Sequence, residues 1–180
     1  VESLVCHSSA AMDSGDRLEA VNKALRGKTE CKEETRWLPL ESNPAIFNTF
    51  SCSLGTPDSW EWVDILGLDE ELLDMVPKPV ASVILLFPCT DSIYAYRRKQ
   101  AAELGGVWSK HLSPDTFFLH QVPAFGNACG TIACVHALSN SRHLFGGLAD
   151  GSPLAGFLHD ARPQSPRQRG HSLVSAPALR

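Results

Sequence analysis

The chain has 180 residues, of which 43% are hydrophobic and 20% charged, and its formal net charge at pH 7 is −4. This length suits one domain with its own core, and so weak a charge argues against nucleic acid or an anionic membrane as the main partner. No apolar run approaches the roughly 20 residues that span a bilayer, so the sequence predicts no membrane-spanning helix.

Residues 1–35 are polar and form a predicted N-terminal extension with one helix, Asp16 to Leu25. The opening VESLVCHSSAAM lacks the basic start and the apolar stretch of a signal peptide. The six cysteines include no CxxC pair, so we expect mostly reduced thiols in a cytoplasmic or nuclear protein. We expect no metal or other cofactor.

Residues 36–160 are rich in large apolar side chains and predict the folded domain. Its first helix follows Asn43, whose side chain suits an N-cap, and ends at Gly55. The next segment, Trp60 to Leu66, alternates apolar and polar residues as a half-buried strand does. A short helix is predicted from Asp69 to Met75, and the prolines that follow end it.

Strands and helices alternate in the second half of this domain. Val80 to Phe87 is apolar on both faces and predicts a central strand covered above and below. A helix is expected over Ser92 to Leu104, and then a strand over Thr116 to Gln121. Two more helices are predicted, at Ala128 to Asn140 and at Leu154 to His159.

After residue 160 the composition shifts to Pro, Arg, Gln, Ser and Gly. Residues 161–180 carry few large apolar side chains, and such a segment cannot bury enough surface to offset the entropy of ordering it. We therefore expect a disordered tail.

The segment GNACGTIACVHALSN places Cys129 at the start of a predicted helix. Unpaired backbone N–H groups and the helix dipole stabilise an anion there, and the thiolate is the attacking form of a cysteine nucleophile. Asn127 and Gly130 leave room for backbone N–H groups to face a carbonyl oxygen. On chemistry alone, a cysteine at a helix start is more often a small buried residue.

Four blocks stand in order along the chain: RWLPLESNP at 36–44, WEWVDILGLDEELLDMVPKPVASVILLFP at 60–88, FFLHQ at 117–121, and NACGT at 127–131, which opens an apolar helix. This order resembles the ubiquitin C-terminal hydrolase family over residues 36 to about 159. The resemblance implies an α/β (α+β), papain-like fold, a central sheet flanked by helices, which is truncated at its C-terminus here.

By this resemblance, the thiolate of Cys129 attacks the carbonyl of ubiquitin's terminal glycine, a histidine acts as base and acid, and an aspartate orients that histidine. Gln121 joins the N–H of the nucleophile in holding the oxyanion. Asp64, in the VDI motif, is either a contact for ubiquitin's arginine-bearing tail or a solvated carboxylate at a strand end. The implied partner is ubiquitin or a ubiquitin-like protein, bound by a monomer.

The spacing before the nucleophile departs from the family pattern. Gln121 lies eight residues before Cys129, two more than in the family, and Pro123 at the family spacing has no N–H and no side-chain donor. Either the loop bulges so that Gln121 keeps its place, or the oxyanion hole is impaired, with Asn127 as a possible substitute donor.

The histidine and aspartate that follow the cysteine in the family have no counterpart in this sequence. His136 lies seven residues after Cys129, about 10 Å along the helix axis, too far to take its proton, and we interpret it as structural. Three further histidines lack a partnering Asp-Gly sequence: His143, His159 and His171. Zinc binding by Cys129, Cys134 and His136 is disfavoured, because the last two side chains point to different sides of the helix.

The sequence thus predicts a thiol-dependent ubiquitin C-terminal hydrolase with Cys129 as nucleophile and Gln121 as oxyanion donor, its base being unassigned. The alternative is a catalytically inactive family member that is at most a weak ubiquitin-binding protein.

Overall fold

The computed structural model describes residues 3–6, 37–88, 90–104, 113 and 115–179. In chain order the elements are β1 (Ser3–Cys6), α2 (Pro44–Leu54), β2 (Trp62–Ile65), α3 (Glu70–Asp74), β3 (Val83–Leu85), α4 (Asp91–Leu104), η2 (Pro123–Phe125), α6 (Cys129–Ser141), α7 (Pro153–Ala161), α8 (Pro166–Val174) and η3 (Pro177–Leu179). The predicted helix Asp16 to Leu25 lies outside the described residues. Among these, no helix is long and apolar enough to cross a membrane.

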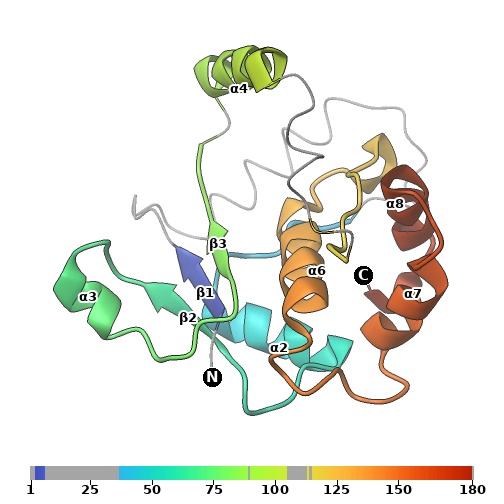
Figure 1. Cartoon of the computed structure of the whole chain (residues 1–180), viewed down its shortest axis with the longest axis horizontal. Helices are drawn as coiled ribbons and strands as arrows, with labels where there is room; N and C mark the ends of the chain where they lie inside the picture. The colour runs from blue at the N-terminus through green and yellow to red at the C-terminus, as the bar shows by residue number, and fades with distance from the viewer. Residues whose placement is uncertain (1–2, 7–36, 89, 105–112, 114, 180) are drawn as a thin grey trace.

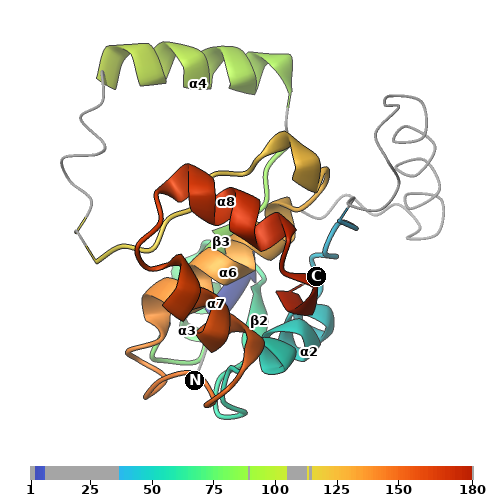
Figure 2. The same cartoon turned by 90° about the vertical axis from the view of Figure 1, so that its right-hand side faces the viewer.

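Helix α6 occupies the middle of the molecule, between the sheet on one side and α7 with α8 on the other (Figure 1). It contacts β3, α2 and α7, and Val135, Cys134 and Leu138 on it are almost fully buried. Helix α4, predicted from the sequence, is present but stands apart from the body in both views (Figures 1 and 2), and none of its residues is buried. The core therefore forms around the helix that begins at Cys129.

The described strands form one parallel sheet in the order β2-β1-β3. The prediction that Val80 to Phe87 is a covered central strand is wrong, because β3 comprises only Val83–Leu85 and lies at the edge of this sheet. Val83 and Leu85 are 57% and 65% exposed, so this edge presents apolar side chains where another strand could pair. The central strand is β1, which the sequence had placed in the polar extension of residues 1–35.

The caps predicted for α2 are confirmed. Asn43 accepts a hydrogen bond from the N–H of Ala45 at 2.9 Å through its side chain, and Gly55 ends the helix with a φ of 104°. The left-handed conformation is one that glycine adopts without steric cost. Phe47 and Leu54 are buried, so α2 turns its apolar face towards the core.

The segment Thr116 to Gln121 is extended but is not a strand, which corrects the prediction. Its backbone is bonded to α6 and to α8 instead of to a neighbouring strand. The N–H of Phe117 donates to Asn140 at 2.8 Å, and the N–H of Leu119 donates to Nε2 of His136 at 3.1 Å. These two acceptors lie one helical turn apart on one face of α6, so the helix itself fixes the segment that leads to Gln121.

The prediction of a disordered tail over 161–180 is wrong for the described residues 161–179. Helix α8 begins with a capping box, in which Ser165 and Gln168 satisfy each other's backbone N–H groups. Leu173 and Leu179 are among the most deeply buried side chains of the chain. Arg169 donates to the carbonyls of Ala161, Arg162 and Phe118 and lies 4.9 Å from the centroid of the Phe117 ring. A few well-placed side chains thus order a segment of low apolar content.

Replacing Gly170 with alanine is expected to destabilise the protein by about 1–3 kcal/mol, because the new methyl group would overpack a close helix contact. A Cβ at this position of α8 would lie 2.1 Å from the backbone carbonyl oxygen of His120, which cannot move without displacing the 116–121 segment. Chemical denaturation of both proteins measures the difference.

The matched control is Gly156→Ala on α7, where a Cβ would meet no atom within 4 Å. This change should stabilise the protein by roughly 0.5–1 kcal/mol, because it only restricts the unfolded chain. If both substitutions had the same effect, α8 would not pack against His120 in solution.

Candidate active site

Cys129 is the first residue of α6, and its side chain is exposed. Ala128 occupies the N-cap position and supplies no side-chain acceptor, so the first N–H groups of the helix are not capped by a side chain. None of the described residues forms a hydrogen bond with the thiol. An uncapped helix N-terminus stabilises a nearby anion, and an accessible thiolate is the species that attacks carbonyl carbon.

Cys134, in the second turn of the same helix, provides the contrast. It is fully buried, and its sulfur lies 3.6 Å from Oγ of Ser51. Burial raises the pKa of the Cys134 thiol to about 12, because a thiolate would lose its hydration there. Of the two cysteines on α6, only Cys129 can serve as a nucleophile.

Gly130 lets the segment that precedes α2 approach the start of α6. A Cβ on this glycine would lie 3.0 Å from Cβ of Leu40 and 3.2 Å from its carbonyl oxygen. The residue after Cys129 must therefore be small for Leu40 to pack there.

The side chain of Gln121 contacts the loop that leads to Cys129. Its side-chain amide nitrogen donates to the carbonyl oxygen of Gly126 at 3.1 Å. The residues between Gln121 and Gly126 include the 3-10 turn η2, Pro123–Phe125, which shortens the path of this loop. Asn127, the substitute donor considered from the sequence, is half-buried and forms no side-chain hydrogen bond with a described residue.

His136 is structural, as its spacing predicted. Its Nε2 accepts the N–H of Leu119, and its ring stacks on Phe118 with centroids 5.3 Å apart and planes 17° apart. Burial lowers the pKa of His136, which favours the neutral ring that can accept this hydrogen bond. This histidine holds the strand-like segment before Gln121 and is not free to act as a base.

Asp64 lies on β2 opposite Val5. Its Oδ1 is buried and has no hydrogen-bond partner among the described residues. This oxygen is therefore not solvated, unlike the solvated carboxylate that was one of the two sequence-based alternatives for Asp64. Burying an unpaired carboxylate oxygen is unfavourable, so a donor supplied from outside the described residues would relieve the cost.

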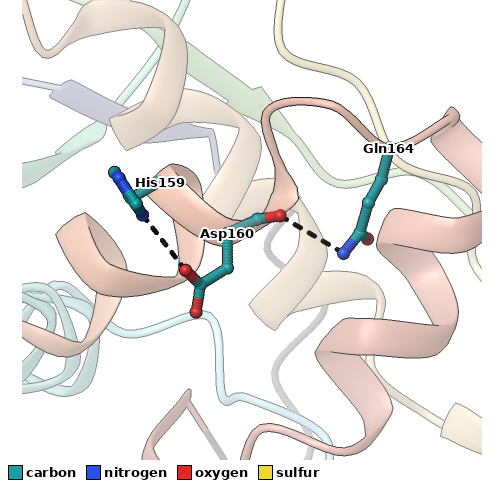
Figure 3. A network of polar contacts seen from close by, with 3 residues as sticks. All are labelled: His159, Asp160 and Gln164. Carbon is teal, nitrogen blue, oxygen red and sulfur yellow. Dashed lines mark hydrogen bonds and ion pairs between the residues drawn. The ribbon is translucent and has the colours of Figure 1, made fainter.

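A histidine and an aspartate do meet on α7, in the pair formed by His159 and Asp160 (Figure 3). Nδ1 of His159 lies 3.1 Å from the Asp160 carboxylate, and Gln164 donates to the backbone carbonyl of Asp160 at 3.3 Å. The two side chains are 89% and 81% exposed, and an ion pair so hydrated contributes roughly 0–1 kcal/mol. No contact within the described part of the chain joins this pair to Cys129.

His171 lies in the segment that was predicted to be a disordered tail. Helix α8 places it near Gln121. His171 and Arg167 line a pocket of about 230 Å³ together with His120, Gln121 and Pro123. The Ser-Pro-x-Gln sequence at residues 165–168, a helix-start signal, could have placed this helix. Within the described ranges, no three side chains of the metal-binding types are grouped to hold an ion.

The fold and the site define a mixed helix-and-strand protein with an accessible thiol at the start of a central helix and a side-chain amide in the loop before it. A family model described as "Ubiquitin carboxyl-terminal hydrolase, family 1" matches residues 37–180. The chain belongs to this family, and the match includes the C-terminal helices that the sequence reading had left out.

Two relatives illustrate the similarity. The chain is 40% identical over 131 residues to human "Ubiquitin carboxyl-terminal hydrolase isozyme L1", which covers 73% of this chain and 56% of the relative. It is 37% identical over 140 residues to "Ubiquitin carboxyl-terminal hydrolase" of Aplysia californica, covering 78% of this chain and 61% of the relative. The chain thus spans a little over half the length of these curated relatives.

Proposed function

We propose that this chain is a thiol-dependent ubiquitin C-terminal hydrolase, a deubiquitinase that cleaves after the terminal glycine of ubiquitin. The observation that carries the proposal is Cys129, an exposed thiol on the first residue of a buried helix, within the stretch that matches the family. The names of the relatives indicate ubiquitin as the substrate.

In the proposed reaction the Cys129 thiolate attacks the carbonyl carbon, and the charge that develops on the carbonyl oxygen needs donors. The N–H of Cys129 and the amide of Gln121 would supply them, which the position of Gln121 beside Gly126 supports. Asp64 would bind a cationic side chain of ubiquitin's tail through its carboxylate.

We further propose the papain-like arrangement of a central sheet flanked by helices, of which the described sheet and α6 would form part. The protein would act as a monomer in the cytoplasm, within ubiquitin-dependent protein catabolism. The free thiols of Cys52, Cys129 and Cys134 suit a reducing compartment.

The test compares two electrophiles of the same chemistry, one attached to the C-terminus of ubiquitin and one attached to a short peptide. Labelling by the ubiquitin probe is expected to be at least on the order of 10²-fold faster, because bound ubiquitin holds the electrophile beside the thiol. Intact mass over time gives both rates. Equal rates would mean that the thiol is reactive without a ubiquitin site, and an absence of labelling would favour the inactive alternative.

A further inference from the structure

The residues that lengthen the spacing between Gln121 and Cys129 form a compact and buried turn. In η2 the N–H of Phe125 donates to the carbonyl of Val122 at 3.1 Å, and the Phe125 ring is completely buried. Gly126 follows with a φ of 67°, a conformation that suits glycine and turns the chain back. This turn carries the Gly126 carbonyl to the Gln121 amide.

Trp37 holds this turn from the other side. Its backbone N–H donates to the carbonyl of Phe125 at 3.1 Å, and it forms a parallel bridge with Gly126. The two rings meet edge to face, with centroids 5.1 Å apart and planes at 90°. The carbonyls of Phe125 and Gly126 are therefore fixed by a buried aromatic pair and by a segment distant in sequence.

The hydrogen bond to Gly126 restricts the amide that it holds. A carboxamide nitrogen carries two N–H groups, and one of them is committed to the Gly126 carbonyl. Because the amide is planar, fixing one N–H fixes the direction of the other. A donor whose direction is set before substrate arrives costs no reorganisation when the oxyanion forms.

We propose that Trp37 and Phe125 are positioning residues, which set the second N–H of Gln121 for the substrate oxygen through the carbonyl of Gly126. This inference rests on the proposed function and explains how a loop two residues longer than the family spacing keeps the glutamine in use. Trp37 and Phe125 do not touch the reacting atoms.

The experiment measures dissociation constants of the whole chain for ubiquitin ending in an aldehyde and for unmodified ubiquitin. The thiolate of Cys129 adds to the aldehyde carbon, the C=O electron pair moves to oxygen, and that oxygen either stays anionic between the donors or takes a proton from water. The ratio of the two constants therefore reports on the oxyanion donors without requiring a general base. Alkylation by iodoacetamide measures the reactivity of the thiol separately.

Phe125→Leu is expected to reduce the preference for the aldehyde on the order of 10-fold, and Gln121→Glu by about 10²-fold, because a carboxylate cannot donate to Gly126 or to the oxyanion. Binding of unmodified ubiquitin and alkylation should not change in Phe125→Leu. Trp37→Phe is the second variant if Phe125→Leu fails to fold, and it should show the same selective loss.

The matched control is Phe145→Leu, the same substitution at a residue 9% exposed that packs on Trp60. It follows the far end of α6, whose 13 residues span about 20 Å. This control should leave the ratio unchanged. If Gln121→Glu lowers the ratio and Phe125→Leu does not, the positioning role is overturned while the proposed function stands. If the unmutated chain shows no aldehyde preference, the proposed function fails and this inference with it.

Discussion

Replacing Cys129 with alanine is expected to abolish covalent labelling of the chain by a ubiquitin probe that carries a C-terminal electrophile. The thiol is the side chain of the first residue of α6 and is exposed, so an electrophile can reach it. Cys134 cannot substitute, since it is buried and its pKa is raised to about 12. Intact mass before and after reaction, with peptide mapping of the adduct, checks the result.

Cys52→Ala is the matched control, because Cys52 is another exposed free cysteine of the described chain. Its thiol donates a hydrogen bond to the carboxylate of Asp58 at 3.8 Å, and it lies on α2, not at the start of α6. We expect this variant to be labelled as fast as the unmodified chain. Labelling that survives Cys129→Ala, or an adduct mapped to a different cysteine, would remove Cys129 from the proposed mechanism.

The elements that could be predicted from the sequence are those set by local chemistry. Helix α2 begins after Asn43, whose side chain accepts the N–H of Ala45, and it ends at Gly55, which has a left-handed backbone conformation. Both signals involve only residues that are near in the sequence. Helix α6 was predicted because its apolar residues are dense and its start carries the family's cysteine motif. The position of Cys129 at the start of this helix could be predicted for the same reason, since it depends on neighbouring residues of the sequence.

Features that depend on distant partners could not be predicted in this way. The 116–121 segment has the composition of a strand, but His136 and Asn140 on α6 take its hydrogen bonds. Helix α8 has a polar composition, yet Gly170 lets it pack directly on the backbone of His120. In both cases the decisive interaction joins residues that lie well apart in the chain, which periodicity and composition do not report.

The loop from Gln121 to Cys129 could be predicted only in part. Sequence spacing showed that Gln121 stands two residues too far from Cys129, and it left open a bulge or an impaired hole. The conformation of this loop depends on Phe125, which is buried in the turn, and on Trp37, whose N–H donates to the carbonyl of Phe125. The conformation of this loop is set by Trp37, which packs on it from a distant part of the chain, so it could not be predicted from the loop residues alone.

Fusing to this chain a segment that carries the histidine and aspartate implied by the family resemblance is expected to raise hydrolysis of a ubiquitin–fluorophore conjugate by about 10²–10⁴-fold. The leaving group needs a proton, and none of the described histidines forms a hydrogen bond with Cys129. Labelling by an electrophilic ubiquitin probe should change far less, because thiolate attack on the probe requires no proton for a leaving group. Both rates are measured on the 180-residue chain and on the fused protein.

Two controls separate added chemistry from added stability. The fused protein with Cys129→Ala should be inactive, and the fused protein with the appended histidine replaced by alanine should return to the rate of the 180-residue chain while keeping its fold. If the 180-residue chain already hydrolyses the conjugate as fast as the fused protein, a base exists within it. His143 and His159 would then be the first residues to replace, together with His171, which lines the same pocket as Gln121.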